Sequence, residues 1–223
     1  MMKLHLPAEL SRKNLPHEVL YSENPEETTT SFSEEEFEAF TGMHYLPHLA
    51  FSSEKVYRKV CRECAKAPVS SRAPWLGEKY RTQIETAFIA PVKISYVSEE
   101  MGWGLFALEP LNPGDFIGEY TGVVRPITFF TDKINPYCFR YPLYGWRFIY
   151  YTIDARKQGN EISFVNHAAE SNCESVVLLL DGLLHVALIA KKSIAVGEQL
   201  FYDYGKNYWR RFADGADPAP ARP

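Results

Sequence analysis

The sequence has no long hydrophobic run and no surplus of basic residues. No stretch approaches the roughly 20 uninterrupted apolar residues that a membrane span needs, and the apolar run near the start is too short for a secretory signal. With 24 Lys and Arg against 28 Asp and Glu, the formal net charge is −4, whereas nucleic-acid binding usually shows as a basic surplus. We therefore expect a soluble protein without direct nucleic-acid or membrane binding, and its acidic balance suits a basic partner.

The sequence also lacks a complete cysteine-based metal site. Its four cysteines are Cys61, Cys64, Cys138 and Cys173, and the first two have CxxC spacing. No second CxxC or Cys/His pair follows at zinc-finger distance, so half of the ligands of a closed site are missing. We expect no metal site and a surface helix that carries two reduced thiols, which is typical of a reducing compartment such as the cytoplasm.

The first 87 residues predict a small helical or irregular flanking region, and no internal repeat is evident. The candidate helices of this region lie within residues 24–40, after Ser31 or Ser33, and at residues 52–67 and 77–88. Ser31 or Ser33 is the candidate N-cap of the first helix, because glutamates fill the turn that follows.

Residues 88–209 predict a compact, mostly β domain. Short strand-like runs, divided by Gly-, Pro- and Asn-rich turns, cover residues 92–98, 104–109, 115–124, 147–154, 175–180, 183–190 and 199–204. Many short strands with little helix between them are typical of antiparallel sheets. Residues 210–223 are rich in Pro and Ala, so we expect a loose tail there.

The stretch GEQLFYDYGKNYW, residues 197–209, is unusually aromatic. On an extended strand, residues two apart point to the same side, so Tyr202 and Tyr204 would face one pocket while Asp203 faces away. Tyrosines that merely fill a core follow the same pattern, and for an isolated Tyr-Asp-Tyr that is the more common case. The rest of the chain has to decide between a pocket and a core.

Two other stretches carry candidate site residues. Gly102-Trp103-Gly104 forms a turn that lets a ligand approach the backbone, and Asn166-His167 precedes Asn172. Each has a structural alternative, namely a tight hairpin for the glycines and a satisfied core pair for Asn166-His167. The occurrence of all three stretches in this order within one domain length is hard to ascribe to chance.

Together these motifs resemble the SET-domain family of protein-lysine methyltransferases. Gly102-Trp103-Gly104 is similar to the first cofactor turn of that family, and Glu119-Tyr120-Thr121-Gly122 to its Glu-Tyr-x-Gly strand. Phe164-Val165-Asn166-His167 resembles the Asn-His loop, GEQLFYDYG resembles the closing motif, and IDARKQGN resembles the segment before the loop. The resemblance covers residues 88–209. It implies a fold of short antiparallel sheets with a threaded, pseudoknot-like core, an exception to the usual avoidance of threading.

The resemblance implies methyl transfer from S-adenosylmethionine to a lysine side chain. A lysine attacks only as a neutral amine, although its ordinary pKa is about 10.4. A dry aromatic channel with a sulfonium cation at its far end disfavours the ammonium form through desolvation and like-charge repulsion. Phenol oxygens and backbone carbonyls can then aim the amine lone pair at the methyl group.

Roles within the site follow from the same resemblance. Tyr204 resembles the essential tyrosine at the base of the channel, Tyr120 a second phenol that orients the lysine nitrogen, and Tyr202 the switch position that favours monomethylation. The residues expected to bind the cofactor are Met101, Gly102, Trp103, Tyr137, Asn166, His167, Tyr204 and Trp209. The first three are expected to act largely through their backbone, and Trp209 by covering the adenine.

The sequence departs from many histone methyltransferases in its zinc ligands. Ala169 occupies the position of a cysteine after the Asn-His pair, and no cysteine follows Cys173. Another segment must therefore close the channel, and our candidate is KNYWRRF, through Tyr208, Trp209 and Phe212. At three further positions of the family motifs, the sequence has Val123, Ser163 and Ser171 in place of the usual Glu, Arg and Pro.

Without these zinc ligands, the sequence resembles the small zinc-free SET proteins of chlamydiae, related intracellular bacteria and some large viruses. This implies a histone or histone-like substrate and, besides a cytoplasmic location, the alternative of a bacterial effector secreted into the host cell and its nucleus. Two other readings stay open: a non-catalytic SET module that binds a peptide or partner, and a purely structural β domain. The substrate lysine and the oligomeric state, a homo-oligomer included, are also left open.

Overall fold

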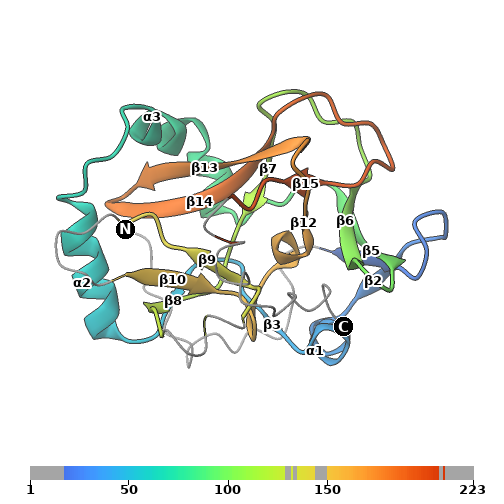
Figure 1. Ribbon diagram of the computed structural model, residues 1–223, viewed down its shortest axis with the longest axis horizontal. Coiled ribbons are helices and arrows are strands. Elements are labelled where there is room, and N and C mark those ends of the chain that lie inside the picture. The colour runs from blue at the N-terminus through green and yellow to red at the C-terminus, as the bar shows by residue number, and fades with distance from the viewer. Residues whose placement is uncertain (1–17, 129–131, 133–134, 144–149, 206–207, 209–223) are drawn as a thin grey trace.

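The computed structural model describes residues 18–128, 132, 135–143, 150–205 and 208. Strands account for 36% and helices for 21% of it, which confirms the mostly β prediction. Three sheets and two strand pairs pack around a main hydrophobic core and a smaller second one, and the helices lie at the periphery (Figure 1). No helix of the described residues is long and apolar enough to cross a membrane.

The strands are short and are shared among several small sheets. The first sheet has the order β2 (Thr30–Phe32), β1 (Val19–Ser22), β5 (Val92–Ser98), β6 (Gly102–Ala107). The second has the order β4 (Ala50–Phe51), β8 (Val123–Pro126), β10 (Tyr151–Asp154), β9 (Cys138–Arg140), and the third β13 (Cys173–Leu180), β14 (Leu183–Ala190), β7 (Phe116–Glu119). The two pairs are β11 (Gln158–Gly159) with β3 (His44–Tyr45), and β12 (Asn166–His167) with β15 (Phe201–Tyr202).

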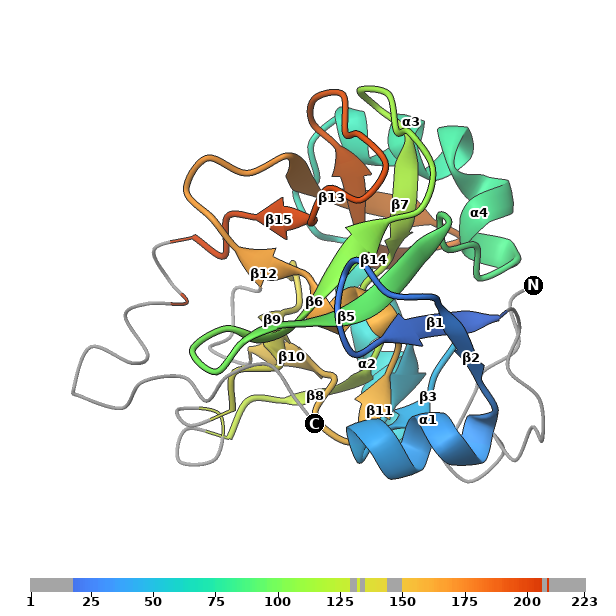
Figure 2. The ribbon, with the colours of Figure 1, turned by 90° about the vertical axis from the view of Figure 1, so that its right-hand side faces the viewer.

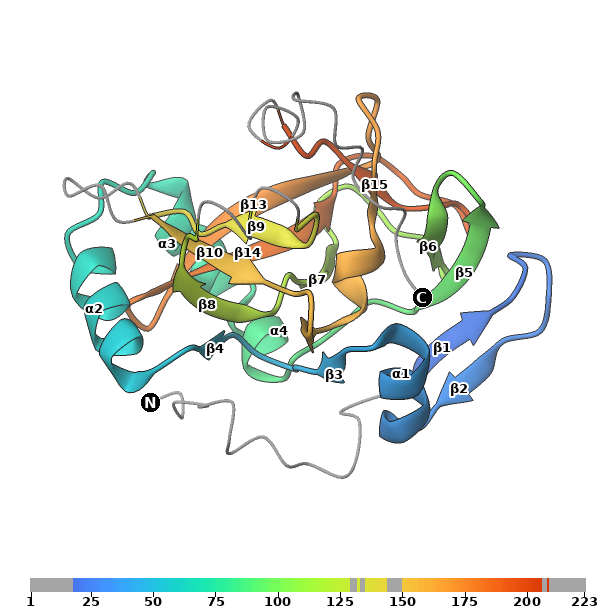
Figure 3. The ribbon, with the colours of Figure 1, turned by 60° about the horizontal axis from the view of Figure 1, so that its bottom comes forward.

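The flanking region contributes strands as well as helices. β1 pairs with β5, β4 with β8 and β3 with β11, all in parallel, so segments before residue 52 are built into the sheets of the later domain. Figure 3 shows β1, β2 and α1 packed at one end of the molecule, beside β5 and β6. The prediction of a helical or irregular flank therefore missed four short strands. β1, β3 and β4 each pair with a distant strand that a local pattern does not show, and β2 pairs with β1.

The helices differ in part from their predicted positions. Ser33, not Ser31, caps α1 (Glu34–Thr41) through a capping box with Glu36, and Gly42 ends the helix with a φ of 64°. Ser31 lies in β2, so the helix starts after the second of the two predicted caps. α2 (Glu54–Cys64) confirms the second helix.

The third predicted helix is two shorter helices that start earlier. α3 (Arg72–Lys79) and α4 (Arg81–Glu85) meet at Tyr80, whose backbone leaves the helical region while its hydroxyl donates to the Gly114 carbonyl at 2.7 Å. Pro74 is compatible with the first turn of α3, where a backbone N–H has no intrahelical acceptor. The predicted start at residue 77 was therefore wrong.

The thiols of α2 are not both at the surface. Cys61 is half-buried, whereas Cys64 is buried and its Sγ lies 3.7 Å from the hydroxyl of Tyr141. Burial raises the pKa of the Cys64 thiol, so it stays neutral and acts as a small core residue. All four cysteines are free, and no group of three or more His, Cys, Asp or Glu within the described residues could hold a metal ion.

Candidate active site

Tyr202 and Tyr204 lie side by side at the end of β15. Their ring centroids are 4.6 Å apart, with 46° between the ring planes. β15 itself ends at Tyr202, so Tyr204 follows the strand rather than belonging to it. Tyr202 is buried and Tyr204 half-buried, while Asp203 between them is exposed. The structure confirms that the two phenols share one side of the chain.

The hydroxyl of Tyr204 is held inside the protein. It donates to the carbonyl of Val165 at 2.8 Å, and the backbone N–H of Tyr204 donates to Nδ1 of His167 at 3.1 Å. Burial, followed by the neighbouring phenols of Tyr202 and Tyr208, raises the pKa of Tyr204 well above 10. The phenol is therefore neutral over the whole physiological pH range, and its oxygen retains lone pairs that can accept a hydrogen bond.

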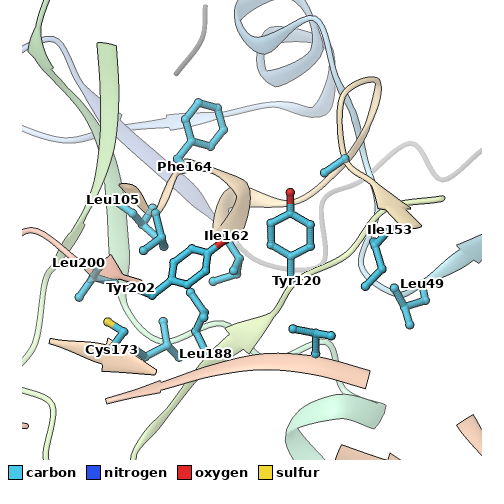
Figure 4. Packing of buried hydrophobic residues seen from close by; sticks show 14 of the residues in the cluster. Leu49, Leu105, Tyr120, Ile153, Ile162, Phe164, Cys173, Leu188, Leu200 and Tyr202 are labelled. Atoms are coloured by element: carbon cyan, nitrogen blue, oxygen red, sulfur yellow. The ribbon is translucent and has the colours of Figure 1, made fainter. Parts of the chain in front are cut away.

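Tyr120 approaches the same region from the bend between β7 and β8. The expected single strand at 115–124 is divided there into β7 and β8. Gly122 lies so close to β10 that a Cβ on it would be 2.8 Å from the carbonyl group of Asp154. The hydroxyl of Tyr120 donates to the carbonyl of Tyr137 at 2.9 Å. Figure 4 shows the rings of Tyr120 and Tyr202 in the buried cluster that also contains Ile162 and Leu188.

Phe139 connects the tyrosines, and sequence reasoning missed it. Its ring lies 5.4 Å from that of Tyr120 and is stacked on that of Tyr202 at 6.4 Å. Phe139 follows Tyr137 by two residues in β9, so the same alternation that singled out Tyr202 and Tyr204 would have found it. We call Tyr120, Phe139, Tyr202, Tyr204 and Tyr208 the tyrosine cluster.

Tyr208 completes the cluster from the C-terminal side. Its ring lies 4.6 Å from that of Tyr204 in an edge-to-face arrangement, and the residue is 9% exposed. The segment that we expected to close the channel thus covers Tyr204 with at least this one ring. The other two residues of that expectation, Trp209 and Phe212, lie outside the described residues.

Asn166 and His167 join the closing segment to the Gly-Trp-Gly strand. β12, which they form, pairs in parallel with β15, and Asn166 Nδ2 donates to the carbonyl of Trp103 in β6 at 3.0 Å. Asn166 is 8% exposed. The ring of His167 lies 5.3 Å from that of Tyr204. Three segments that are far apart in sequence therefore meet around one point.

The turn before β6 brings backbone rather than side chains to this point. Gly102 has a φ of 70°, in the left-handed region that favours glycine. A Cβ at Gly104 would lie 2.4 Å from Nε2 of Gln199, and the same nitrogen is 3.5 Å from the sulfur of Met101. The side chain of Trp103 points elsewhere, toward Phe40 and Tyr96.

Asn172 fixes the closing segment in place. Its Nδ2 donates to Oε1 of Glu198 at 3.0 Å and to the carbonyl of Gln199 at 2.8 Å, and its Oδ1 accepts the N–H of Phe201 at 2.8 Å. The residue is 3% exposed. Asn172 is thus a positioning residue, since it holds the strand that carries Tyr202.

An ion-pair network supports the loop of Tyr137. Arg125 donates to carboxylate oxygens of Asp154, at 2.7 Å, and of Asp132, while Asn135 donates to the other Asp154 oxygen at 2.9 Å and accepts the N–H of Tyr137 at 3.0 Å. Sequence reasoning gave no sign of this network, because its members lie on three separate segments. It holds the Tyr137 carbonyl where Tyr120 binds it.

Comparison with known proteins agrees with this arrangement. The family model of the SET domain matches residues 102–205. This part of the chain is a SET domain. It begins at the Gly-Trp-Gly turn and ends just after Tyr204, and so includes all three segments that meet at the tyrosine cluster.

Relatives of the SET domain are histone-lysine methyltransferases by name. "Histone-lysine N-methyltransferase ash1" of Drosophila melanogaster is 33% identical over 156 residues, which are 66% of this chain and 6% of the relative. "Histone-lysine N-methyltransferase EZ2" of Zea mays is 35% identical over 129 residues, 56% of this chain and 13% of the relative. The chain therefore spans only a small part of the length of these relatives.

A solved structure supports the fold. The structure of ATXR5 in complex with a mono-methylated histone H3.1 is 22% identical, has a TM-score of 0.56, and is matched over 80% of this chain and 85% of that chain. At this identity the likeness concerns the fold alone. It extends beyond the SET domain into the flanking segments, which agrees with the strand pairing of β1, β3 and β4.

Proposed function

We propose that this protein is a protein-lysine methyltransferase that uses S-adenosylmethionine. The observation that carries the proposal is the tyrosine cluster: buried, neutral phenols meet the Asn166–His167 strand and the Gly102 turn at one point. The SET domain and the names of its relatives support the same reaction class.

The residues around this point fit the cofactor. The Nδ2 of Asn166 is bound to the carbonyl of Trp103, and its Oδ1 is an amide acceptor that suits the amino group of an amino-acid ligand. Gly102, in its left-handed conformation, lets a ligand approach the backbone of Met101 and Trp103. His167 and Tyr137 complete the proposed set, together with Trp209, which lies outside the described residues. When bound, S-adenosylmethionine supplies the methyl group on a cationic sulfur.

The tyrosine cluster prepares the lysine amine. An ammonium group loses hydration among the rings of Tyr120, Phe139 and Tyr202, so its pKa falls toward neutrality and the free amine becomes accessible. The Tyr204 hydroxyl already donates to Val165, so its oxygen is left to accept from the amine or from a polarised methyl group. The bound cofactor would supply the methyl group to the amine lone pair and would leave as a neutral thioether, and the surplus proton of the methylated nitrogen would go to water.

The proposed substrate is a histone or a histone-like protein. The relatives are named for histone lysines, and the net charge of −4 suits a basic partner. We propose mainly monomethylation, because the Tyr202 ring is only 4.6 Å from that of Tyr204. A phenol so close can hold a water molecule against the amine, in the space that a second methyl group needs.

Mass spectrometry with S-adenosylmethionine and a panel of histones, bacterial histone-like proteins and the protein itself tests the proposal. A mass increase of 14 Da on a lysine, about the mass of one added CH₂ unit, is the expected product. Cofactor binding by calorimetry without any methylated product would instead identify a non-catalytic SET module. Neither binding nor product would leave a structural β domain.

A further inference from the structure

A second group of aromatic residues surrounds a hollow at the end of the first sheet. The hollow has a volume of about 380 Å³ and is lined by Tyr21, Glu23, Phe40, Tyr96 and Trp103. Tyr21 comes from β1, Tyr96 from β5, Trp103 from β6 and Phe40 from α1, which packs against this sheet (Figure 2). We call these five residues the aromatic cage.

The ring of Trp103 stands at a steep angle to the rings of Phe40 and Tyr96. Phe40 and Trp103 are 4.7 Å apart with 85° between their planes, and Trp103 and Tyr96 are 5.6 Å apart with 71°. Phe40 and Tyr21 are 5.6 Å apart with 38°. The rings therefore form adjoining walls rather than a stack, so a guest in the hollow can meet more than one aromatic face.

The cage is open at one side and closed at its floor. Trp103 is 7% exposed, whereas Tyr96 is 39% exposed and Glu23 is also exposed. The sheet places Tyr21, Ile94, Tyr96 and Trp103 on one face, since Tyr21 pairs with Ile94 and Tyr96 with Trp103. The rim is thus reachable from solvent while the floor is part of the core.

The one charged group of the cage is free to bind a cation. Glu23 makes no hydrogen bond or ion pair with any described residue. Lys93 would be an obvious partner on the next strand, but its Nζ donates to the carbonyls of Pro25 at 2.6 Å and Glu27 at 3.4 Å. These contacts fix the loop after Glu23, and Ser22 before it is bonded to Ser95 at 3.1 Å.

We propose that the aromatic cage binds the trimethylammonium group of a methylated lysine side chain. Aromatic faces attract a cation through the ring quadrupole, and a methylated ammonium is cheaper to dehydrate than an unmodified one. Glu23 adds a favourable charge at the rim. A choline headgroup shares the cation, but its phosphate lies close to it and would be repelled by Glu23, so lysine in a protein is the better match.

The cage lies next to the cofactor residues without sharing their side chains. Trp103 belongs to the cage through its ring and touches Asn166 only through its carbonyl. The proposal therefore goes beyond methyl transfer, and its test needs no turnover.

NMR titration with Nα-acetyl-trimethyllysine methylamide, with S-adenosylhomocysteine saturating the cofactor site, tests the cage. We expect binding about 5- to 30-fold tighter than that of the isostere with a neutral tert-butyl group, which is the range of one to a few cation–π contacts. Equal binding of the two probes would overturn the proposal. So would loss of trimethyllysine binding on addition of S-adenosylhomocysteine, because the hollow would then belong to the cofactor site.

Variants locate the bound cation. Tyr96→Ala and Glu23→Gln are expected to weaken trimethyllysine binding several-fold and to leave methyl transfer unchanged, since neither residue belongs to the tyrosine cluster. Phe88→Ala is the matched control, because Phe88 is an exposed ring, 42% accessible, that is not part of the cage. Undiminished binding in Tyr96→Ala would place the cation elsewhere, and phosphocholine binding as tightly as trimethyllysine would refute the lysine assignment.

Discussion

The tyrosine cluster and the aromatic cage are both built from aromatic rings, yet their polar groups differ. In the cluster, the hydroxyls of Tyr120 and Tyr204 donate to backbone carbonyls, and the buried Tyr204 phenol is neutral, unlike a carboxylate. In the cage, a carboxylate without a hydrogen-bond or ion-pair partner among the described residues stands at an open rim. A dry, neutral pocket disfavours the ammonium cation and therefore favours the neutral amine that reacts. An open pocket with a negative charge favours a bound cation. Aromatic residues can therefore line both a site that disfavours a cation and a site that binds one.

The largest expected effect is the loss of turnover in Tyr204→Phe. The variant removes one hydroxyl that is buried against Val165, so we expect kcat to fall about 10²–10³-fold, the cost of one preorganised polar contact in a transition state. Cofactor affinity, measured by calorimetry, should change little. Tyr96→Phe is the matched control, because it removes a hydroxyl from the aromatic cage. Equal losses of kcat in both variants would show that the tyrosine cluster and the cage do not differ in their role in methyl transfer.

Asn172→Ala is expected to weaken the tyrosine cluster but not the cage. It leaves the N–H of Phe201 without its acceptor and removes two donated hydrogen bonds, so the free energy of unfolding should drop by about 1–3 kcal/mol. Urea unfolding measures this change. Asn112→Ala, at an exposed position, should have no comparable effect, and unaltered stability in Asn172→Ala would deny that Asn172 holds β15.

The pH dependence of stability separates the buried phenol from an exposed one. The folded pKa of Tyr204 is raised above the unfolded value of about 10, so its stabilising contribution is complete below pH 10 and is lost as the pH rises above it. The unfolding free energy should fall as the pH rises above about 10, and it should fall less steeply in Tyr204→Phe. Identical pH profiles for the two proteins would mean that the Tyr204 phenol ionises as freely as one in water. Turnover of the unmodified protein should show no decline below pH 10 from this group.

The smallest expected effect is a change of product in Tyr202→Phe. Without the Tyr202 hydroxyl, a water molecule beside the amine is held less firmly, so di- and trimethyl-lysine should increase several-fold while the first transfer is nearly unchanged. A time course by mass spectrometry records the three products. Abundant trimethyl-lysine from the unmodified protein would remove Tyr202 from this role.

Local patterns predicted much of this molecule. Glycine and proline spacing predicted most of the strands after residue 88, the glutamate-rich turn after Ser31 or Ser33 predicted α1, and the two-residue period placed Tyr202 beside Tyr204. These features depend on neighbours within a few residues, so the sequence carries them directly. The motifs around Gly102, Tyr120 and Asn166 added the SET domain because their order is specific.

Only the tertiary structure decided which distant segments meet. The strands of the flanking region, the ion-pair network of Arg125 with Asp132 and Asp154, and the contact of Phe139 with Tyr120 and Tyr202 each join separate segments. The aromatic cage depends most on tertiary structure, because Tyr21 and Phe40 reach Trp103 only after β1 pairs with β5 and α1 packs on that sheet. A local period tells which side of an element a residue faces, but not what it faces, since the partner is chosen by burial of apolar surface over the whole core.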